Sequence, residues 1–415
     1  MKHRRLTYGA VALAVLLAYP PEPTHAAQGD FSRDDRKTLV AKAADAIENR
    51  YLDAKKGAAI AGALRRDASL HQADIAAPLF AVHINEALFS ASGDAHLKLR
   101  WMPKSVEGSL SIPPDFGVRA VRILDGNIGL LRLDGFYDTV EARRHLLTSL
   151  SLLQYTDALI LDFRENQGGA SEVVRLLQGC FFTTPEKVMI YEDSPDDRID
   201  SYSEKWTSDA FCDGKPLAVL VGPRTASAAE DFALSVQVFE LGTLIGERTA
   251  GAAHFVEHVW LDKGFRLAVS VGRPVHPLTG DNWEGSGLSP DVTATENADL
   301  VAHVNLLEAL SRGAQRGDLQ YLSLRLSTGL AETTSREPLK SYAGRYGPLR
   351  VDLLADGLQL RGLGYKSGLL SAGSGAFLME EDDLPAVLFS EPDERGKRQL
   401  TLLYPNGEKQ TFGAR

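Results

Sequence analysis

The stretch that decides the fold reads Leu217-Ala-Val-Leu-Val221-Gly-Pro-Arg-Thr-Ala-Ser227-Ala-Ala-Glu230. Its first five residues are apolar and predict a buried strand. A helix is predicted next, from a stripe at helical spacing formed by Ala229, Phe232, Ala233 and Val236. Ser227 therefore lies where a strand turns into a helix, and the amide of Ala228 lies at the positive end of the helix dipole. This geometry is typical of a nucleophilic serine, but a serine that only caps the helix fits it too.

The sequence on both sides of this stretch alternates between apolar strands and helices. Strands are predicted at 127–133, 158–162 and 244–246, and helices at 141–153 and 171–178. A hairpin is predicted from 255 to 271, with its turn at Asp262-Lys263-Gly264. Such alternation indicates an α/β layered core.

Two further parts flank this core. Apolar stripes at helical spacing predict an N-terminal helical domain at 27–104, followed by the catalytic α/β core at 105–298. Residues 299–336 predict a helical connection. Alternating apolar residues and turn signals then predict a small all-β module at 337–415.

The first 26 residues predict a secretory signal peptide, because basic residues precede a short apolar run and a Thr24-His25-Ala26 cleavage site. No cysteine follows the apolar run, so no lipid or other membrane anchor is expected. The whole chain has 45 basic and 55 acidic residues, and losing three basic and one acidic residue on cleavage changes its net charge from −10 to −12. This charge argues against nucleic acid as a partner. The predicted location is periplasmic or extracellular, and the oligomeric state stays open.

The only two cysteines are Cys180 and Cys212. In an exported chain a pair of this kind favours a disulfide, and the alternative is two buried thiols.

Three further signals are candidates for a site shared with Ser227. Gly168-Gly169 ends a strand, where an amide can approach a ligand closely and supply an oxyanion donor, although an ordinary tight turn has the same pattern. His96 lies in a loop between a helix and a strand, where most histidines are simply solvated. Glu284 lies among turn residues beside Trp283, and its default interpretation is an exposed carboxylate.

The order and context of these motifs resemble the carboxyl-terminal-processing (tail-specific) serine peptidase family. The branch they resemble includes interphotoreceptor retinoid-binding protein and the tricorn core protease. The resemblance runs from about Thr38 to Val292. It includes the run 161–169, Thr225–Glu230, Gly246-Glu-Arg-Thr-Ala-Gly251 and Asn282–Asp291. It implies the spiral β-β-α (ClpP/crotonase-like) core of that clan, with a serine nucleophile.

The resemblance also selects between two mechanisms of that family. One uses a Ser–Lys dyad, but the position of its lysine is Ala252 here. The other uses Ser, His and Glu, and Gly93-Asp94-Ala95-His96 and Glu284 match its motifs. The predicted catalytic residues are Ser227, His96 and Glu284, with Ala228 and Gly168 or Gly169 holding the oxyanion. Some relatives carry a serine where Ala95 stands, which leaves the orientation of the His96–Glu284 pair less defined.

A zinc-peptidase pattern, His254-Phe-Val-Glu-His258, is interpreted as coincidence, because it requires a helix and this segment opens a hairpin. His254 is expected at most to line the cleft. No metal and no cofactor is predicted. No PDZ domain is expected, because too few residues separate Trp101 from Phe116.

Two functions follow from the resemblance. The first is an exported serine peptidase acting on peptide or protein substrates. The second is a non-catalytic protein that binds apolar ligands on the same fold. The presence of serine, histidine and glutamate in their matching motifs favours the enzyme.

Overall fold

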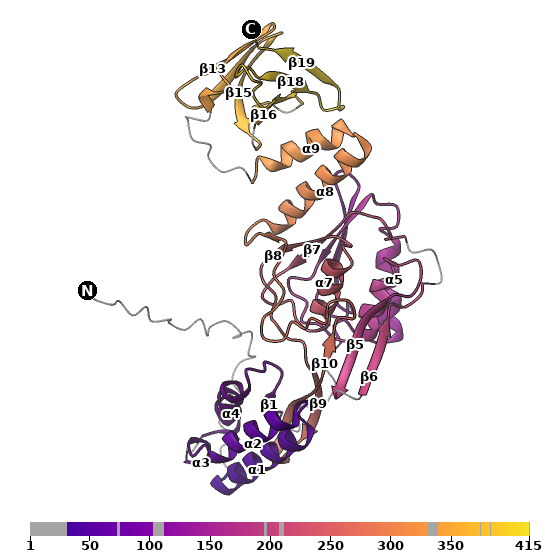
Figure 1. Cartoon of the computed structure of the whole chain (residues 1–415), viewed down its shortest axis with the longest axis vertical. Helices are drawn as coiled ribbons and strands as arrows, with labels where there is room; N and C mark the ends of the chain where they lie inside the picture. The colour runs from indigo at the N-terminus through magenta and orange to yellow at the C-terminus, as the bar shows by residue number, and fades with distance from the viewer. Residues whose placement is uncertain are drawn as a thin grey trace, which may run out of the picture.

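The computed structural model describes residues 31–72, 75–102, 112–194, 197–206, 211–330, 339–373, 375–381 and 383–414. The described chain forms three parts along one long axis, with helices at one end, an α/β region in the middle and a β module at the other end (Figure 1). The predicted signal peptide lies outside these residues. None of the described helices combines the length and the apolar character that crossing a lipid bilayer requires.

The middle part is built on a six-stranded sheet in the order β11-β8-β7-β4-β3-β2. Its strands are parallel except β2, which pairs with β3 in the antiparallel direction. The bounds are β2 (Val118–Leu124), β3 (Ile128–Leu133), β4 (Ala158–Asp162), β7 (Leu217–Val221), β8 (Thr243–Gly246) and β11 (Val292–Thr293).

Helices cover both faces of this sheet. One face carries α5 (Val140–Ser151), α6 (Ser171–Gln178) and α7 (Ala228–Val238), and the other carries α8 (Ala298–Ala314) and α9 (Gly317–Ser327). Side chains of β4 alternate between the two cores: Leu159 and Leu161 join the first, and Ala158 and Ile160 join the second. Burial on both faces explains why the strands read as continuous apolar runs. The predicted mixed α/β architecture is confirmed.

A second sheet joins the N-terminal helices to the middle part. Its path is β1-β10-β5-β6, with β9 also paired to β10. The bounds are β1 (Lys98–Trp101), β5 (Lys187–Ser194), β6 (Asp197–Tyr202), β9 (Phe255–Trp260) and β10 (Phe265–Val275). The helices α1 (Arg33–Arg50), α2 (Ala54–Arg66), α3 (Ser69–Gln72) and α4 (Ala77–Ser92) share one core with β1 and β10.

The hairpin β9–β10 has the turn that the sequence predicts, a short 3₁₀ segment at Asp262–Gly264 in which Lys263 has φ 60°. Although this hairpin follows the central strands in sequence, the side chains of Phe265 and Leu267 pack against the N-terminal helices. The hairpin therefore couples the helical part to the loop that precedes it, residues 249–254.

The C-terminal part is an antiparallel sheet in which each strand pairs with the next. Its strands are β12 (Gly344–Tyr346), β13 (Leu349–Leu353), β14 (Leu358–Gly362), β15 (Tyr365–Ser371), β16 (Ala376–Met379), β17 (Ala386–Phe389), β18 (Gln399–Leu403) and β19 (Lys409–Gly413). A bridge between Tyr346 and Ala414 brings the last strand to the first, so the sheet is barrel-like around one apolar core. The predicted all-β module is thus present, and Tyr321 of α9 packs against it in a smaller cluster.

The helical connection predicted at 299–336 forms two helices, α8 and α9. The break is at Gln315, which has φ 52° and ends α8. A Cβ atom at Gly317 would lie 2.4 Å from the carbonyl oxygen of Gly407 in the C-terminal part. This close tertiary approach has no local signal in the helical pattern.

Candidate active site

Ser227 lies between β7 and α7, at the N-cap position of the helix, as the sequence predicts. Its backbone has φ 54° and ψ −122°, a left-handed conformation that costs of order 1–3 kcal/mol for a residue other than glycine. Thr225 holds the turn: its hydroxyl donates to the carbonyl of Phe163 at 2.8 Å and accepts from the amide of Gly222 at 2.9 Å. Such strain is typical of functional sites, and here it belongs to the candidate nucleophile.

Glu230 fixes the elbow from inside the protein. It is 0% exposed, and its Oε2 accepts the amides of Ser227 at 2.9 Å and Ala252 at 2.8 Å. Its Oε1 accepts the Thr249 hydroxyl at 2.5 Å and the Gly251 amide at 2.7 Å. Burial raises the pKa of Glu230, and these four donors counteract only part of that effect. From the sequence, Glu230 has no predicted role, although the Ser-x-x-Glu spacing is that of a capping box.

The predicted oxyanion donors differ in whether their amides are occupied. Gly168 lies against the elbow, since a Cβ atom there would be 2.8 Å from the Cβ of Ser227, but its amide donates to the side chain of Asn166 at 2.8 Å. The amides of Gly169 and Ala228 have no hydrogen-bond partner among the described residues. Gly169 must be glycine, because with φ 138° its Cβ would lie 2.0 Å from the carbonyl oxygen of Phe136. Of the three amides predicted as oxyanion donors, those of Gly169 and Ala228 are therefore the ones without a partner among the described residues.

His96 and Glu284 approach each other from distant parts of the chain. The Nδ1 atom of His96 lies 3.6 Å from Oε2 of Glu284, just beyond hydrogen-bond distance. That Nδ1 and Oε1 of Glu284 are both buried and unpartnered among the described residues. Burial acts to raise the pKa of Glu284, but the side chains of His96 and His254 and the amide of Ala253 bring it below the ordinary value.

The loop at 249–254 joins the elbow to this pair. The amide of Ala252 donates to Glu230, and the next amide, of Ala253, donates to Oε2 of Glu284 at 2.7 Å. The elbow and the carboxylate are thus held by neighbouring peptide groups. Within the described part of the chain, the hydroxyl of Ser227 makes no hydrogen bond to His96.

A second histidine and a second carboxylate complete the cluster. Asp94 has a fully buried side chain, and its Oδ2 accepts from Nδ1 of His254 at 3.0 Å and from the Tyr51 hydroxyl at 2.9 Å. Burial acts to raise the pKa of Asp94, but the hydrogen bonds that it accepts, first of all from His254, together with the charge of that ring hold that pKa well below its usual range. From the sequence, Asp94 is predicted only as part of a motif, and His254 only as a residue that lines the cleft. No sequence spacing connects them, because 160 positions separate the two.

Three members of this cluster have the geometry of a metal site. Asp94, His254 and Glu284 each place one ligand atom within 4.8 Å of the others. The His-x-x-Glu-His pattern does not contribute to it as a motif, because residues 255–260 form strand β9 and His258 is not in the group. The oxygens of Asp94 are already used: Oδ2 by the two donors named above, and Oδ1 by the amides of His96 at 2.8 Å and Leu97 at 3.3 Å. Hydrogen bonding therefore accounts for the cluster.

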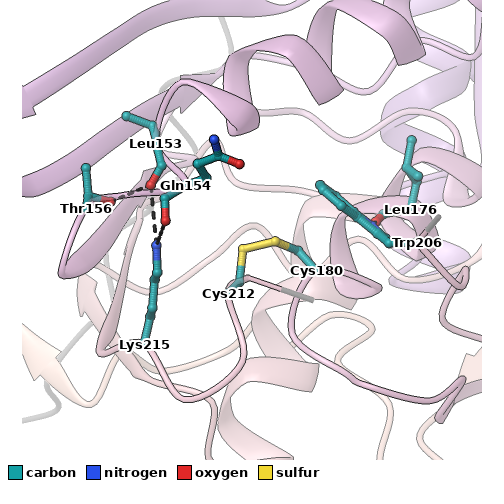
Figure 2. Close-up of a disulfide and its surroundings, with 8 residues drawn as sticks. All are labelled: Leu153, Gln154, Thr156, Leu176, Cys180, Trp206, Cys212 and Lys215. Atoms are coloured by element: carbon teal, nitrogen blue, oxygen red, sulfur yellow. Dashed lines mark hydrogen bonds between the residues drawn. A yellow bond between two sulfur atoms is a disulfide. The ribbon is translucent and has the colours of Figure 1, made fainter. Parts of the chain in front are cut away.

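Cys180 and Cys212 are joined by a disulfide that closes the segment after α6 (Figure 2). Both are buried, and the amide of Cys212 donates to the carbonyl of Cys180 at 3.1 Å. Beside them Lys215 donates to the carbonyl of Gln154 at 2.7 Å, and Trp206 donates to the carbonyl of Leu176 at 2.7 Å (Figure 2). The bridge ties α6, which starts at the Gly168-Gly169 loop, to the segment that leads into β7.

The fold and the elbow define a class: an α/β protein with a strained serine between a parallel strand and a helix. Residues 127–294 match the model of peptidase family S41. The central part of this chain is therefore similar to peptidase family S41, which confirms the predicted resemblance. Ser227, Glu284 and the glycine pair lie within the matched residues, and His96 lies outside them.

Several known proteins are similar to part of this chain. A carboxyl-terminal-processing protease of Synechocystis sp. is 30% identical over 171 residues, which are 40% of this chain and 37% of that protein. A protease of the same name from Picosynechococcus sp. is 31% identical over 170 residues, covering 40% and 38%. The chain thus spans under two fifths of the length of these relatives. A lipoprotein structure from Streptococcus agalactiae is 19% identical with a TM-score of 0.47, over 71% of this chain and 99% of that one.

Proposed function

We propose that this protein is a serine peptidase that hydrolyses peptide or protein substrates through Ser227, His96 and Glu284. The observation that carries the proposal is the elbow: a strained serine beside two unoccupied amides, those of Ala228 and Gly169. A helix-capping serine needs neither the strain nor the open amides. The family of the central domain and the names of its relatives support the same activity.

The proposed reaction follows from this geometry. Ser227 attacks the scissile carbonyl while His96 takes its proton, and the resulting oxyanion accepts from the amides of Ala228 and Gly169. His96 then returns the proton to the leaving amine, and water hydrolyses the acyl-enzyme by the same route. Glu284 receives Nδ1–H of His96 and stabilises the imidazolium. The 3.6 Å separation of this pair suits a resting state that tightens on substrate binding.

Export and the finer fold assignment belong to the same proposal. Export to the periplasm or the cell exterior is supported by the signal-peptide pattern, and the Cys180–Cys212 disulfide fits an oxidising compartment. A spiral β-β-α core is supported by the family model that residues 127–294 match, and the lack of a PDZ domain within this core is supported by the few residues between Trp101 and Phe116. The apolar-ligand carrier is the weaker alternative, because a carrier has no use for open amides beside a strained serine.

A fluorophosphonate probe tests the proposal directly. We expect it to label the wild-type protein and to lose that labelling in Ser227→Ala, because the probe requires an activated serine. Ser289→Ala is the matched control, an exposed serine in the loop that carries Glu284. Equal labelling of wild type and Ser227→Ala, or none of a folded wild type, would remove the support for a serine peptidase.

A further inference from the structure

The imidazole of His254 lies between two carboxylates. Its Nδ1 is 3.0 Å from Oδ2 of Asp94 and 3.7 Å from Oε2 of Glu284. The backbone amide of His254 also donates to Oε2 of Glu284, at 3.0 Å. His254 therefore contacts the candidate orienting carboxylate through both its main chain and its side chain.

One proton on Nδ1 can serve only one of these carboxylates at a time. The distances assign it to Asp94, since 3.0 Å is a hydrogen bond and 3.7 Å is not. Oε2 of Glu284, which already accepts the amides of Ala253 and His254, then receives no further hydrogen bond from the ring of His254, and the Nδ1 of His96 lies 3.6 Å from it. The two imidazoles are neighbours, with ring centroids 6.5 Å apart; Nδ1 of His254 faces the buried carboxylate of Asp94, and Nδ1 of His96 faces the half-buried carboxylate of Glu284.

Asp94 links both histidines. Its Oδ1 accepts the backbone amide of His96 at 2.8 Å, and its Oδ2 holds the ring of His254 with the help of Tyr51. The carboxylate of Asp94 thus positions the backbone of His96, the candidate base. It also positions the ring of His254, which lies beside Glu284. Two carboxylates at this separation repel each other, and His254 is the group between them that reduces the repulsion.

We propose that His254, held by Asp94, is a positioning residue that keeps Glu284 oriented toward His96. It acts through Glu284 and does not contact the substrate. The inference rests on the proposed function and adds a second histidine–carboxylate pair behind the catalytic one.

The test measures kcat and KM on a peptide substrate for His254→Ala and His254→Asn. A hydrogen bond to a charged group is worth about 1.5–3 kcal/mol, so we expect His254→Ala to lower kcat by about 10- to 100-fold with KM little changed. His254→Asn keeps a donor near the Nδ1 position and should recover part of the loss. His258→Ala is the matched control, because His258 lies on the same segment and outside the cluster.

A double-mutant cycle separates positioning from a general structural role. If His254 acts through Glu284, then His254→Ala should cost little more once Glu284→Gln is already present. The inference would be overturned if the losses of kcat in the two single variants multiplied in full in the double variant. A wild-type kcat for His254→Ala, or an equal loss of kcat in His258→Ala, would overturn it too. Ser227→Ala in the same series keeps the two proposals apart: an active Ser227→Ala contradicts the peptidase, whereas an inactive one beside a normal His254→Ala contradicts only the role of His254.

Discussion

The serine elbow and the histidine arm of the candidate site differ in how completely their polar groups are satisfied. At the elbow, Glu230 accepts four hydrogen bonds of 2.9 Å or less and locks the backbone of Ser227. In the arm, His96 and Glu284 are 3.6 Å apart, and each keeps a buried atom without a partner among the described residues. The elbow is formed in the resting protein, whereas the arm still has a hydrogen bond to make.

The origin of each region in the chain explains this difference. The elbow is one continuous strand–turn–helix segment, so its geometry follows from local structure and one clamp. The arm combines the loop after α4 with a loop just before β11, brought together by packing between the N-terminal helices and the hairpin β9–β10. The His96–Glu284 distance therefore depends on that packing, whereas the backbone of Ser227 is held by Glu230 within its own helix.

The largest expected effect tests whether the two regions act as one unit. Ser227→Ala and His96→Ala should each lower kcat by about 10⁴- to 10⁶-fold, and the double variant should be no slower, because members of a triad act together. Turnover of a peptide substrate measures this. Substantial turnover by His96→Ala would show that the histidine arm is not needed. A double variant whose loss of kcat equals the product of the two single losses would show that the regions act separately.

The next effect tests the clamp. In Glu230→Gln one oxygen becomes an NH₂ group and faces two donors, so two buried donors lose their acceptor at about 1–3 kcal/mol each. We expect a matching fall in the free energy of unfolding in urea, together with slower probe labelling. Glu296→Gln, an exposed substitution, is the control. Unchanged stability of Glu230→Gln would mean that the elbow does not depend on this carboxylate.

The disulfide should matter for stability more than for chemistry. Replacing Cys180 and Cys212 by alanine opens a loop with a sequence separation of 32, which costs about 3–4 kcal/mol in the chain-entropy model. Below the unfolding transition, probe labelling should change much less, because Glu230 holds the elbow independently. Urea unfolding of this variant and of reduced wild type should agree; labelling that is lost before unfolding would place the bridge within the active geometry.

The most confined effect concerns Asp231, the residue after Glu230, and changes only the pH dependence of stability. Burial raises the pKa of Asp231 to about 7. The hydrogen bond from Gln178 and the positive charge of Arg175 act to lower that pKa but do not offset burial. The folded protein therefore binds the proton of the Asp231 carboxyl more tightly than the unfolded chain does. The contribution of this proton to stability is complete below the pKa of the unfolded chain, near 4. It is lost as pH rises toward 7, at about 1.4 kcal/mol per pH unit. Asp231→Asn should remove this part of the pH dependence in thermal or urea unfolding; parallel stability profiles for both proteins would contradict the assignment.

The sequence predicted the elbow, the glycine pair and the all-β C-terminal module, because each rests on a local period or turn. It missed the role of Glu230, whose partners at 249–252 come together with it only in the fold. It also missed the pairing of Asp94 with His254. Of the two glycines it offered as oxyanion donors, only the structure distinguishes them, since the side chain of Asn166 occupies the amide of Gly168.

The sequence by itself determined the α/β class, the strand–serine–helix unit and the residue types available for catalysis, because short-range periodicity and steric limits at glycine and serine act within a few residues. Only the tertiary structure decided which groups meet. The fold buries Glu230 among its four donors and places His254 beside two carboxylates. It also brings Gly317 into close contact with the C-terminal part. These outcomes depend on distances between segments far apart in the chain, which no local pattern contains.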